Sequence, residues 1–146
     1  MTDYYPDEEG SIVDGLICGF CYADAAVGEG QIVTWGTSAS GRVAVTPGAA
    51  IGDGIGVALK AASGAGAYIP VAFSGIVKMT TAETLAIGAL VISNSSLAVV
   101  GMGDSTTITI NSATQKILGC TMQACVAPAD ELLVLLGGDG ISAGNL

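Results

Sequence analysis

The feature that most constrains the fold is a stretch of sequence that occurs twice. The first copy runs from Ile55 to Gly75 and the second from Leu118 to Gly138. Each copy has an apolar arm, a connector of small residues and a second apolar arm, which predicts one β-hairpin used twice. Aligned without a gap, the copies match at four positions: Gly56 with Gly119, Ala61 with Ala124, Val71 with Val134, and Gly75 with Gly138.

The first arm of each copy alternates with a period of two. Successive side chains of a strand point to opposite faces, so this period predicts a half-buried strand and not a helix. The residues on one face are Ile55, Val57, Leu59 and Ala61 in the first copy, and Leu118, Cys120, Met122 and Ala124 in the second.

The similarity continues outside the hairpins. Gly88-Ala-Leu-Val-Ile matches Gly30-Gln-Ile-Val-Thr, and Leu97-Ala-Val matches Val43-Ala-Val. These matches predict a single β domain over residues 15–138 with two similar halves, about 15–79 and 80–138. The second half carries an insertion at 101–114, in which the alternating Thr107-Ile-Thr-Ile predicts a further strand.

Further strands are expected before, between and after these segments. The sequence Thr80-Thr-Ala-Glu83 has the form of a capping box, which predicts one short helical turn. About ten short strands separated by Gly, Pro and Ser turns indicate an all-β fold, a small antiparallel barrel or sandwich with at most one short helix. The additional strands are expected at Leu16–Tyr22, Gly30–Trp35, Arg42–Thr46 and Ile76–Met79.

Composition narrows the possible partners. Charged residues make up 12% of the 146 residues, against a typical value of about 25%, so we expect neighbouring subunits to cover part of the surface. The net charge of −9, with four isolated Lys and Arg, argues against binding nucleic acid. Apolar runs are too short for a membrane helix, and the acidic start is unlike a secretory signal. We therefore expect synthesis in a cytoplasm.

The two ends differ from the body. Residues 1–14 hold five of the 13 acids and have no apolar period. This segment is either a frayed terminus or an extended arm in which Tyr4, Tyr5 and Pro6 contact a neighbouring surface. Residues 139–146 are rich in glycine and are expected to be a flexible tail.

The return arm of the second hairpin is apolar on both faces. Leu132, Val134 and Leu136 are expected to face the core, while Leu133 and Leu135 make the opposite face apolar too. Such a strand either lies against another subunit near Leu133 and Leu135 or is covered by other segments of its own chain. In the first copy Pro70 lies on this outer face and suits an edge strand. Trp35 is expected in core or interface packing.

The residue types needed for catalysis are scarce. The chain has no histidine, which removes the usual activator of Ser and Cys nucleophiles and the commonest metal ligand. The acids of the body lie in or beside turns, so we predict no catalytic residue and no cofactor. Cys18, Cys21, Cys120 and Cys125 could form a four-sulfur zinc site. However, Cys120 aligns with Val57, which predicts a small core residue, and strand residues three or five apart face opposite ways. Buried free thiols without a metal are therefore favoured, with a disulfide as the alternative if the protein leaves the cell.

The order of the strand sequences resembles that of the tailed-phage capsid cement, or head decoration, family of small β proteins. The resemblance covers about Leu16 to Gly138 and depends on order and spacing more than on single residues. The strand sequences are Gly30-Gln-Ile-Val, Arg42-Val-Ala-Val, Ile55-Gly-Val-Ala-Leu-Lys-Ala-Ala, Tyr68-Ile-Pro-Val-Ala-Phe-Ser-Gly-Ile-Val, Gly88-Ala-Leu-Val-Ile, Leu118-Gly-Cys-Thr-Met and Glu131-Leu-Leu-Val-Leu-Leu.

The resemblance implies a structural protein on the outer surface of an icosahedral phage head. Its expected partners are the major capsid protein, further copies in a homotrimer, and neighbouring decoration subunits reached by the arm. Two other functions stay open. One is a surface module that binds a glycan or protein through loops near 38–41 or 101–105. The other is a small metal or redox protein that uses the cysteines.

Overall fold

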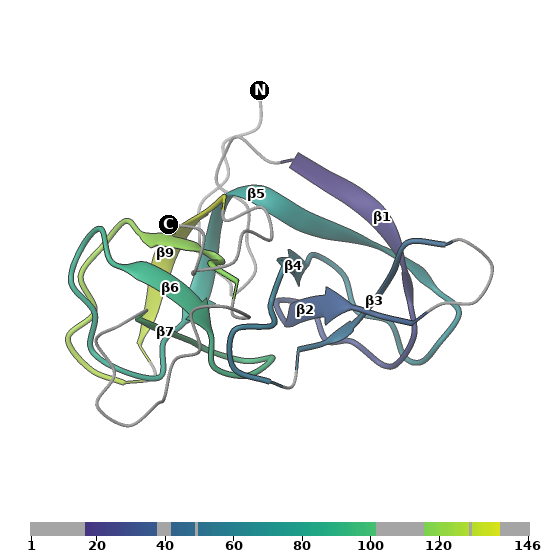
Figure 1. The fold of residues 1–146 in the computed structure, drawn as a ribbon, viewed down its shortest axis with the longest axis horizontal. Helices are drawn as coiled ribbons and strands as arrows, with labels where there is room; N and C mark the ends of the chain where they lie inside the picture. The colour runs from purple at the N-terminus through teal and green to yellow at the C-terminus, as the bar shows by residue number, and fades with distance from the viewer. Residues whose placement is uncertain (1–16, 38–41, 49, 102–115, 129, 138–146) are drawn as a thin grey trace.

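A computed structural model describes residues 17–37, 42–48, 50–101, 116–128 and 130–137, and this part of the chain is all-β (Figure 1). The fold class predicted from the sequence is confirmed. No helix in the described part is long and apolar enough to cross a membrane. The strands are β1 (Ile17–Ala23), β2 (Ile32–Trp35), β3 (Ala44–Pro47), β4 (Gly56–Ala58), β5 (Tyr68–Thr80), β6 (Leu90–Ser93), β7 (Val99–Gly101), β8 (Gly119–Thr121) and β9 (Glu131–Leu136).

The first half of the chain forms a closed five-stranded ring. Its strands follow the order β1-β3-β2-β4-β5, and β1 also pairs with β5, which closes the ring. We call this ring the first barrel; it uses only residues 68–74 of the long strand β5. Figure 1 shows β5 running on past this ring toward the strands of the second half.

The second half repeats this arrangement. Residues 75–80 of β5 pair with β9, and the order continues through β8 and β6 to β7. A parallel bridge between Thr81 and Val99 corresponds to the parallel pairing of β1 with β3 in the first half. We call this set the second barrel. Gly75, with a φ of 114°, is the first residue of this second part of β5, and its left-handed backbone suits glycine.

The pairings match position by position. Val57 faces Ala72 across the first hairpin, and Cys120 faces Leu135 across the second. The backbone hydrogen bond from Gly30 N to Ala58 O, 2.8 Å, has its counterpart from Gly88 N to Thr121 O, 2.9 Å. The hairpin predicted to occur twice is therefore present in both halves. Isolated antiparallel bridges repeat as well, Val27 with Ala62 and Leu85 with Cys125.

The two matched glycines are explained by close packing of the backbone. A Cβ at Gly56 would lie 2.5 Å from the carbonyl oxygen of Ala72. A Cβ at Gly119 would collide with the carbonyl oxygen of Leu135, which is the equivalent position. A side chain at either site would push the two strands of the hairpin apart. The glycine match seen in the sequence thus reflects the same close approach in both hairpins.

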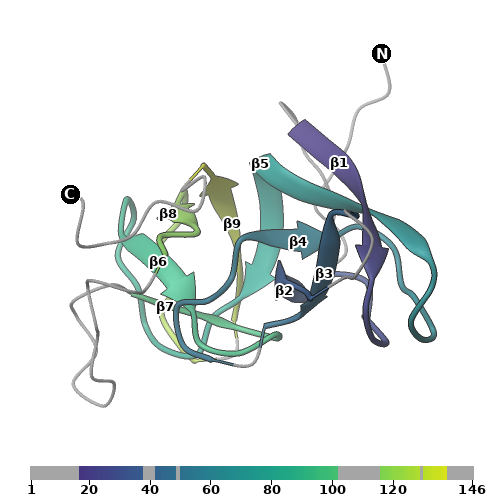
Figure 2. The ribbon, with the colours of Figure 1, turned by 45° about the vertical axis from the view of Figure 1, so that its right-hand side comes forward.

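Two apolar clusters form the core. The first fills the first barrel and is made of Cys21, Ala23, Val27, Val33, Val45, Ile55, Ala58, Ala62, Ile69 and Val71. The second fills the second barrel, and three buried residues from the outer face of the first barrel join it: Ile32, Val57 and Ala72. We call these three the covered row. The second barrel therefore packs on the outside of the first, as Figure 2 shows from the side.

Backbone hydrogen bonds join the two barrels at the same place. Ile32 N donates to Ser96 O at 2.8 Å, and Gly52 N donates to Ser93 O at 2.8 Å. The Ser93 hydroxyl oxygen also accepts from Gly54 N at 2.9 Å. The turn between β6 and β7 thus lies against β2 and against the loop that precedes β4.

Three local predictions were wrong. Residues 80–83 form no helical turn: Thr81 continues the strand by bridging to Val99, and the Glu83 carboxylate accepts from Gly101 N at 2.7 Å instead of capping a helix. Pro70 does not lie on an edge, because β1 and β4 flank β5. The residues predicted to share one face of each first arm do not: Ile55 and Leu118 lie in the core of their own barrel, whereas Val57 and Cys120 lie on the outer face. The arm, the insertion strand at 107–110 and the tail lie outside the described residues.

Candidate interaction surfaces

Trp35, a predicted interface residue, ends β2 directly opposite Val45 of the first core, so it shares the inward-facing side of β2 and becomes exposed where that strand ends. Its side chain is 51% exposed, and its ring stacks on Phe73 with centroids 5.9 Å apart. Phe73 packs in turn against the first core cluster. One face of Trp35 is therefore held in place while the other remains open, an arrangement that suits contact with another protein.

A second aromatic surface lies on β1 and β5. Phe20 is directly opposite Pro70, and Tyr22 is directly opposite Tyr68. Phe20 is 72% exposed, and the rings of Tyr22 and Tyr68 meet edge to face at 5.7 Å. The Arg42 guanidinium lies 5.0 Å from the centre of the Tyr22 ring. We call these five residues the aromatic face. It presents large, partly immobilised side chains of the kind that dominate protein interfaces.

Most of this surface was not predicted from the sequence. Phe20 and Tyr22 alternate with Cys21 and Ala23, which are buried. That period of two in β1 was the signal that could have identified Phe20 as an outward residue. Its partner strand was harder to place, since the pairing of β1 with β5 joins residues about 50 apart in the chain.

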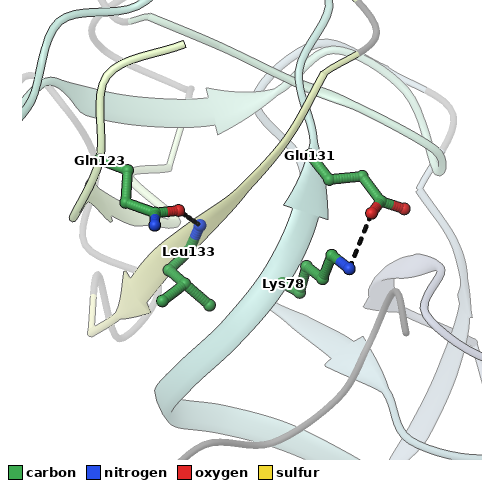
Figure 3. A network of polar contacts seen from close by, with 4 residues as sticks. All are labelled: Lys78, Gln123, Glu131 and Leu133. Carbon is green, nitrogen blue, oxygen red and sulfur yellow. Dashed lines mark hydrogen bonds and ion pairs between the residues drawn. The ribbon is translucent and has the colours of Figure 1, made fainter. Parts of the chain in front are cut away.

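The equivalent surface of the second barrel is polar. Lys78 Nζ lies 2.9 Å from Glu131 Oε2, and the Gln123 side-chain oxygen accepts from Leu133 N at 3.0 Å (Figure 3). These residues line a hollow of about 150 Å³. Pockets that bind drug-sized ligands are typically about 300 Å³ or more, so this hollow is suited to surface contact and not to enclosing a ligand.

Leu133 and Leu135, the other predicted interface residues, point away from the second core. Leu132, Val134 and Leu136 are buried, as expected. Leu133 is half-buried beside Gln123, while Leu135 is exposed. Leu135 lies directly opposite Cys120, and Cys120 lies directly opposite Leu90. We call Leu90, Cys120 and Leu135 the apolar row.

The cysteines whose side chains are described lie apart. Cys21 is in the first core and Cys125 in the second, where its sulfur is 3.1 Å from the Thr81 hydroxyl oxygen. Burial raises the pKa of the Cys21 thiol, which holds it in the unreactive protonated form. Cys120 is half-buried on the outer face, so the prediction that it is a core residue was wrong. Within the described ranges, no group of three or more Cys, Asp or Glu is placed to hold a metal ion.

Tyr4, Tyr5 and Pro6, the remaining predicted contact residues, lie outside the described residues, as do the loops at 38–41 and 102–105. Their proposed roles therefore stay predictions.

Comparison with known proteins identifies the family of the chain. The sequence matches the phage cement protein family over residues 21–136, which is most of the chain. The chain belongs to the phage cement protein family. The match begins within β1 and ends with β9, so it includes both barrels of this cement protein.

A solved structure supports the fold. The cement protein is similar to the N base of head fiber gp8.5 in bacteriophage phi29, with a TM-score of 0.57 and 9% identity over 87% of this chain and 98% of that one. At this identity the similarity concerns the fold alone. No curated protein matches the sequence. Family membership identifies a structural protein of the phage virion, and so confirms the predicted family and location.

Proposed function

We propose that this cement protein binds the outer surface of an icosahedral phage head as a homotrimer and stabilises the shell by bridging major capsid protein subunits. The family match supports a capsid role. The observation that carries the finer proposal is the aromatic face, where Phe20 and Tyr68 stand exposed on a rigid pair of strands. Bound to the shell, such side chains lose little conformational entropy and bury a large apolar area.

Bridging would stabilise the shell through the area buried. A cement subunit that contacts two capsid subunits must lose one of these contacts before the subunits separate. Once a cement subunit has bound one capsid subunit, its second contact forms at a high effective concentration because the two contacts are linked. Because the cement protein binds the assembled shell and not its separated subunits, mass action shifts the equilibrium toward the assembled head.

Sedimentation with expanded empty heads tests the proposal. The wild-type protein should pellet with the heads and raise the temperature at which they break open. Replacing Phe20 and Tyr68 by serine should weaken binding at least tenfold, since interface anchors commonly contribute more than about 1.4 kcal/mol each. Val126→Ser is the matched control, because Val126 is an exposed apolar residue outside the aromatic face.

Equal binding by the double variant and the control would show that the aromatic face does not contact the shell. Absence of any binding by the wild type would contradict the proposed function itself.

The arm is tested separately. We expect deletion of residues 1–14 to weaken head binding while leaving the trimer intact, because the arm is predicted to contact the shell or the next decoration subunit. Head sedimentation and light scattering of the truncated protein measure these two effects. Unchanged affinity for heads would rule out a role of the arm in binding.

A further inference from the structure

We propose that the apolar row is the docking site for the first barrel of a second copy of this chain. The inference rests on the homotrimer in the proposed function and names the two surfaces that would form its subunit contact. The contact joins different surfaces of the two copies, head to tail, as in a closed ring of subunits.

The row is a continuous strip across three strands. Cys120 on the central strand β8 is directly opposite Leu90 on β6 and Leu135 on β9. Directly opposite residues of antiparallel strands project from the same face and touch. Leu90 is 39% exposed and Leu135 is 44% exposed, with half-buried Cys120 between them.

The repeat within the chain shows what covers such a strip. The covered row occupies the same positions of the first barrel: Val57 is directly opposite Ile32 and Ala72. There the exposed fractions are 1% for Ile32 and 0% for Val57 and Ala72. All three join the core cluster of the second barrel. In the one place where this strip is buried, its cover is therefore a barrel of the same fold.

The position at which the second barrel contacts the first has an exposed counterpart in the first barrel. The second barrel reaches the first through its β6–β7 turn, where Ser93 and Ser96 accept hydrogen bonds from the first barrel. Trp35 occupies in the first barrel the position that Ser93 occupies in the second. Trp35 is directly opposite Val45, and Ser93 is directly opposite Val99, which is the counterpart of Val45. Trp35 is half exposed at the end of β2. The first barrel thus presents to a second copy an exposed aromatic side chain at the position that its own second barrel uses for the internal contact.

The charges of the chain predict how salt affects this contact. Each copy carries a net charge of −9, so the copies repel each other at long range. The row itself is uncharged, and its burial is driven by the hydrophobic effect. Salt screens the repulsion and leaves the apolar contact. Association of copies should accordingly strengthen as the salt concentration rises, the opposite of a contact made by ion pairs.

Light scattering without phage heads provides the first test. The wild-type protein should be oligomeric, and Leu135→Asp should reduce the particle mass to that of one chain, because the contact would bury an unpaired carboxylate. Val126→Asp is the control, since it places the same charge at an apolar residue that is 84% exposed and outside the row, and it should keep the wild-type mass. A monomeric wild type, or an oligomeric Leu135→Asp protein with a native circular dichroism spectrum, would overturn the proposal.

Cysteine chemistry tests the location of the contact. Peptide mapping after alkylation should find Cys120 at least tenfold less reactive in the wild type than in Leu135→Asp. In a Cys18→Ser background, Trp35→Cys should allow an intermolecular disulfide to Cys120, formed by air oxidation with a copper catalyst. A disulfide between two Cys120 residues would instead show that rows pack on each other and would overturn the head-to-tail contact.

Head binding is measured independently of self-association. If the Leu135→Asp monomer still sediments with heads, the subunit contact is confirmed as separate from the shell contact. If the wild type assembles as expected but does not bind heads, the proposed function fails while this inference stands.

Discussion

The two barrels repeat the same strand pairings but differ in what their outer faces carry. Val57 is fully buried on the outside of the first barrel, whereas its counterpart Cys120 is half-buried on the second. The outer face of β1 and β5 is aromatic, while the equivalent face of β5 and β9 carries the Lys78–Glu131 ion pair. The strand pairings and the close-packed glycines are shared, and the two barrels differ most at their outer positions.

The interiors differ more subtly. Ala23 and Ala58 face the inside of the first barrel, and their counterparts in the second are the buried Thr81 and Thr121. The Thr121 hydroxyl donates to Ala86 O at 2.7 Å and accepts from Ala89 N at 3.0 Å. A buried hydroxyl with both kinds of partner avoids the cost of an unsatisfied polar group. The second barrel therefore depends on side-chain hydrogen bonds where the first depends on small apolar residues.

The largest difference in stability between the two barrels is expected when a carboxylate is placed at matched outer positions. Val57→Asp should lower the free energy of unfolding by about 3–5 kcal/mol or more, since it buries an unpaired charge between the barrels. Cys120→Asp should cost less than about 1 kcal/mol in the isolated chain because that side chain reaches water. Urea unfolding of dilute samples measures both. Similar losses of stability for the two variants would show that the covered row and the apolar row are buried to the same extent.

The matched glycines should give the next largest effect. Gly56→Ala and Gly119→Ala should each cost about 1–3 kcal/mol, because each added methyl group meets a carbonyl oxygen of the opposite strand. Gly64→Ala is the control: its Cβ would have no atom within 4 Å, so stability should change little. The same unfolding assay applies. A loss of stability at only one of the two glycines would indicate that the strands of the two hairpins pack differently although their residue pairings match.

Thr121→Val should distinguish the interiors. The substitution keeps the shape but removes the hydroxyl, leaving Ala89 N and Ala86 O without that partner, and should cost about 1–3 kcal/mol. Thr121→Ser retains the hydroxyl and serves as the control, with a smaller loss for the missing methyl group. If valine proved as stable as threonine, the buried hydrogen bonds would not support the second barrel.

The smallest effect is expected at the ion pair. Glu131→Gln should change stability by less than about 1 kcal/mol, because the Glu131 side chain is 42% exposed and exposed pairs contribute little. The difference from wild type should shrink as salt is added. Thermal unfolding at low and high salt measures this, with Glu29→Gln as a control at another exposed acid. A loss of several kcal/mol would mean that the pair supports the β5–β9 pairing.

Local pattern was enough to predict much of the fold. The matched Gly56 and Gly119, the alternation in β9 and the order of strands predicted two related hairpins within an all-β fold, and the structure confirms them. Residues 80–83 misled the prediction, because a capping-box sequence says nothing about the distant Val99 that pairs with Thr81. The aromatic face was missed for the same reason: it depends on the pairing of β1 with β5.

The sequence alone determined the repeat, the strand character and the shortage of reactive groups, because these follow from residue type and from spacing along the chain. Only the tertiary structure decided which of two equivalent rows is buried. Ile32 and Leu90 occupy matching positions in matching strands, yet one lies under the second barrel and the other lies at the surface. Local sequence sets the direction of a side chain relative to its strand. Whether another part of the chain covers it depends on packing between segments far apart in the sequence.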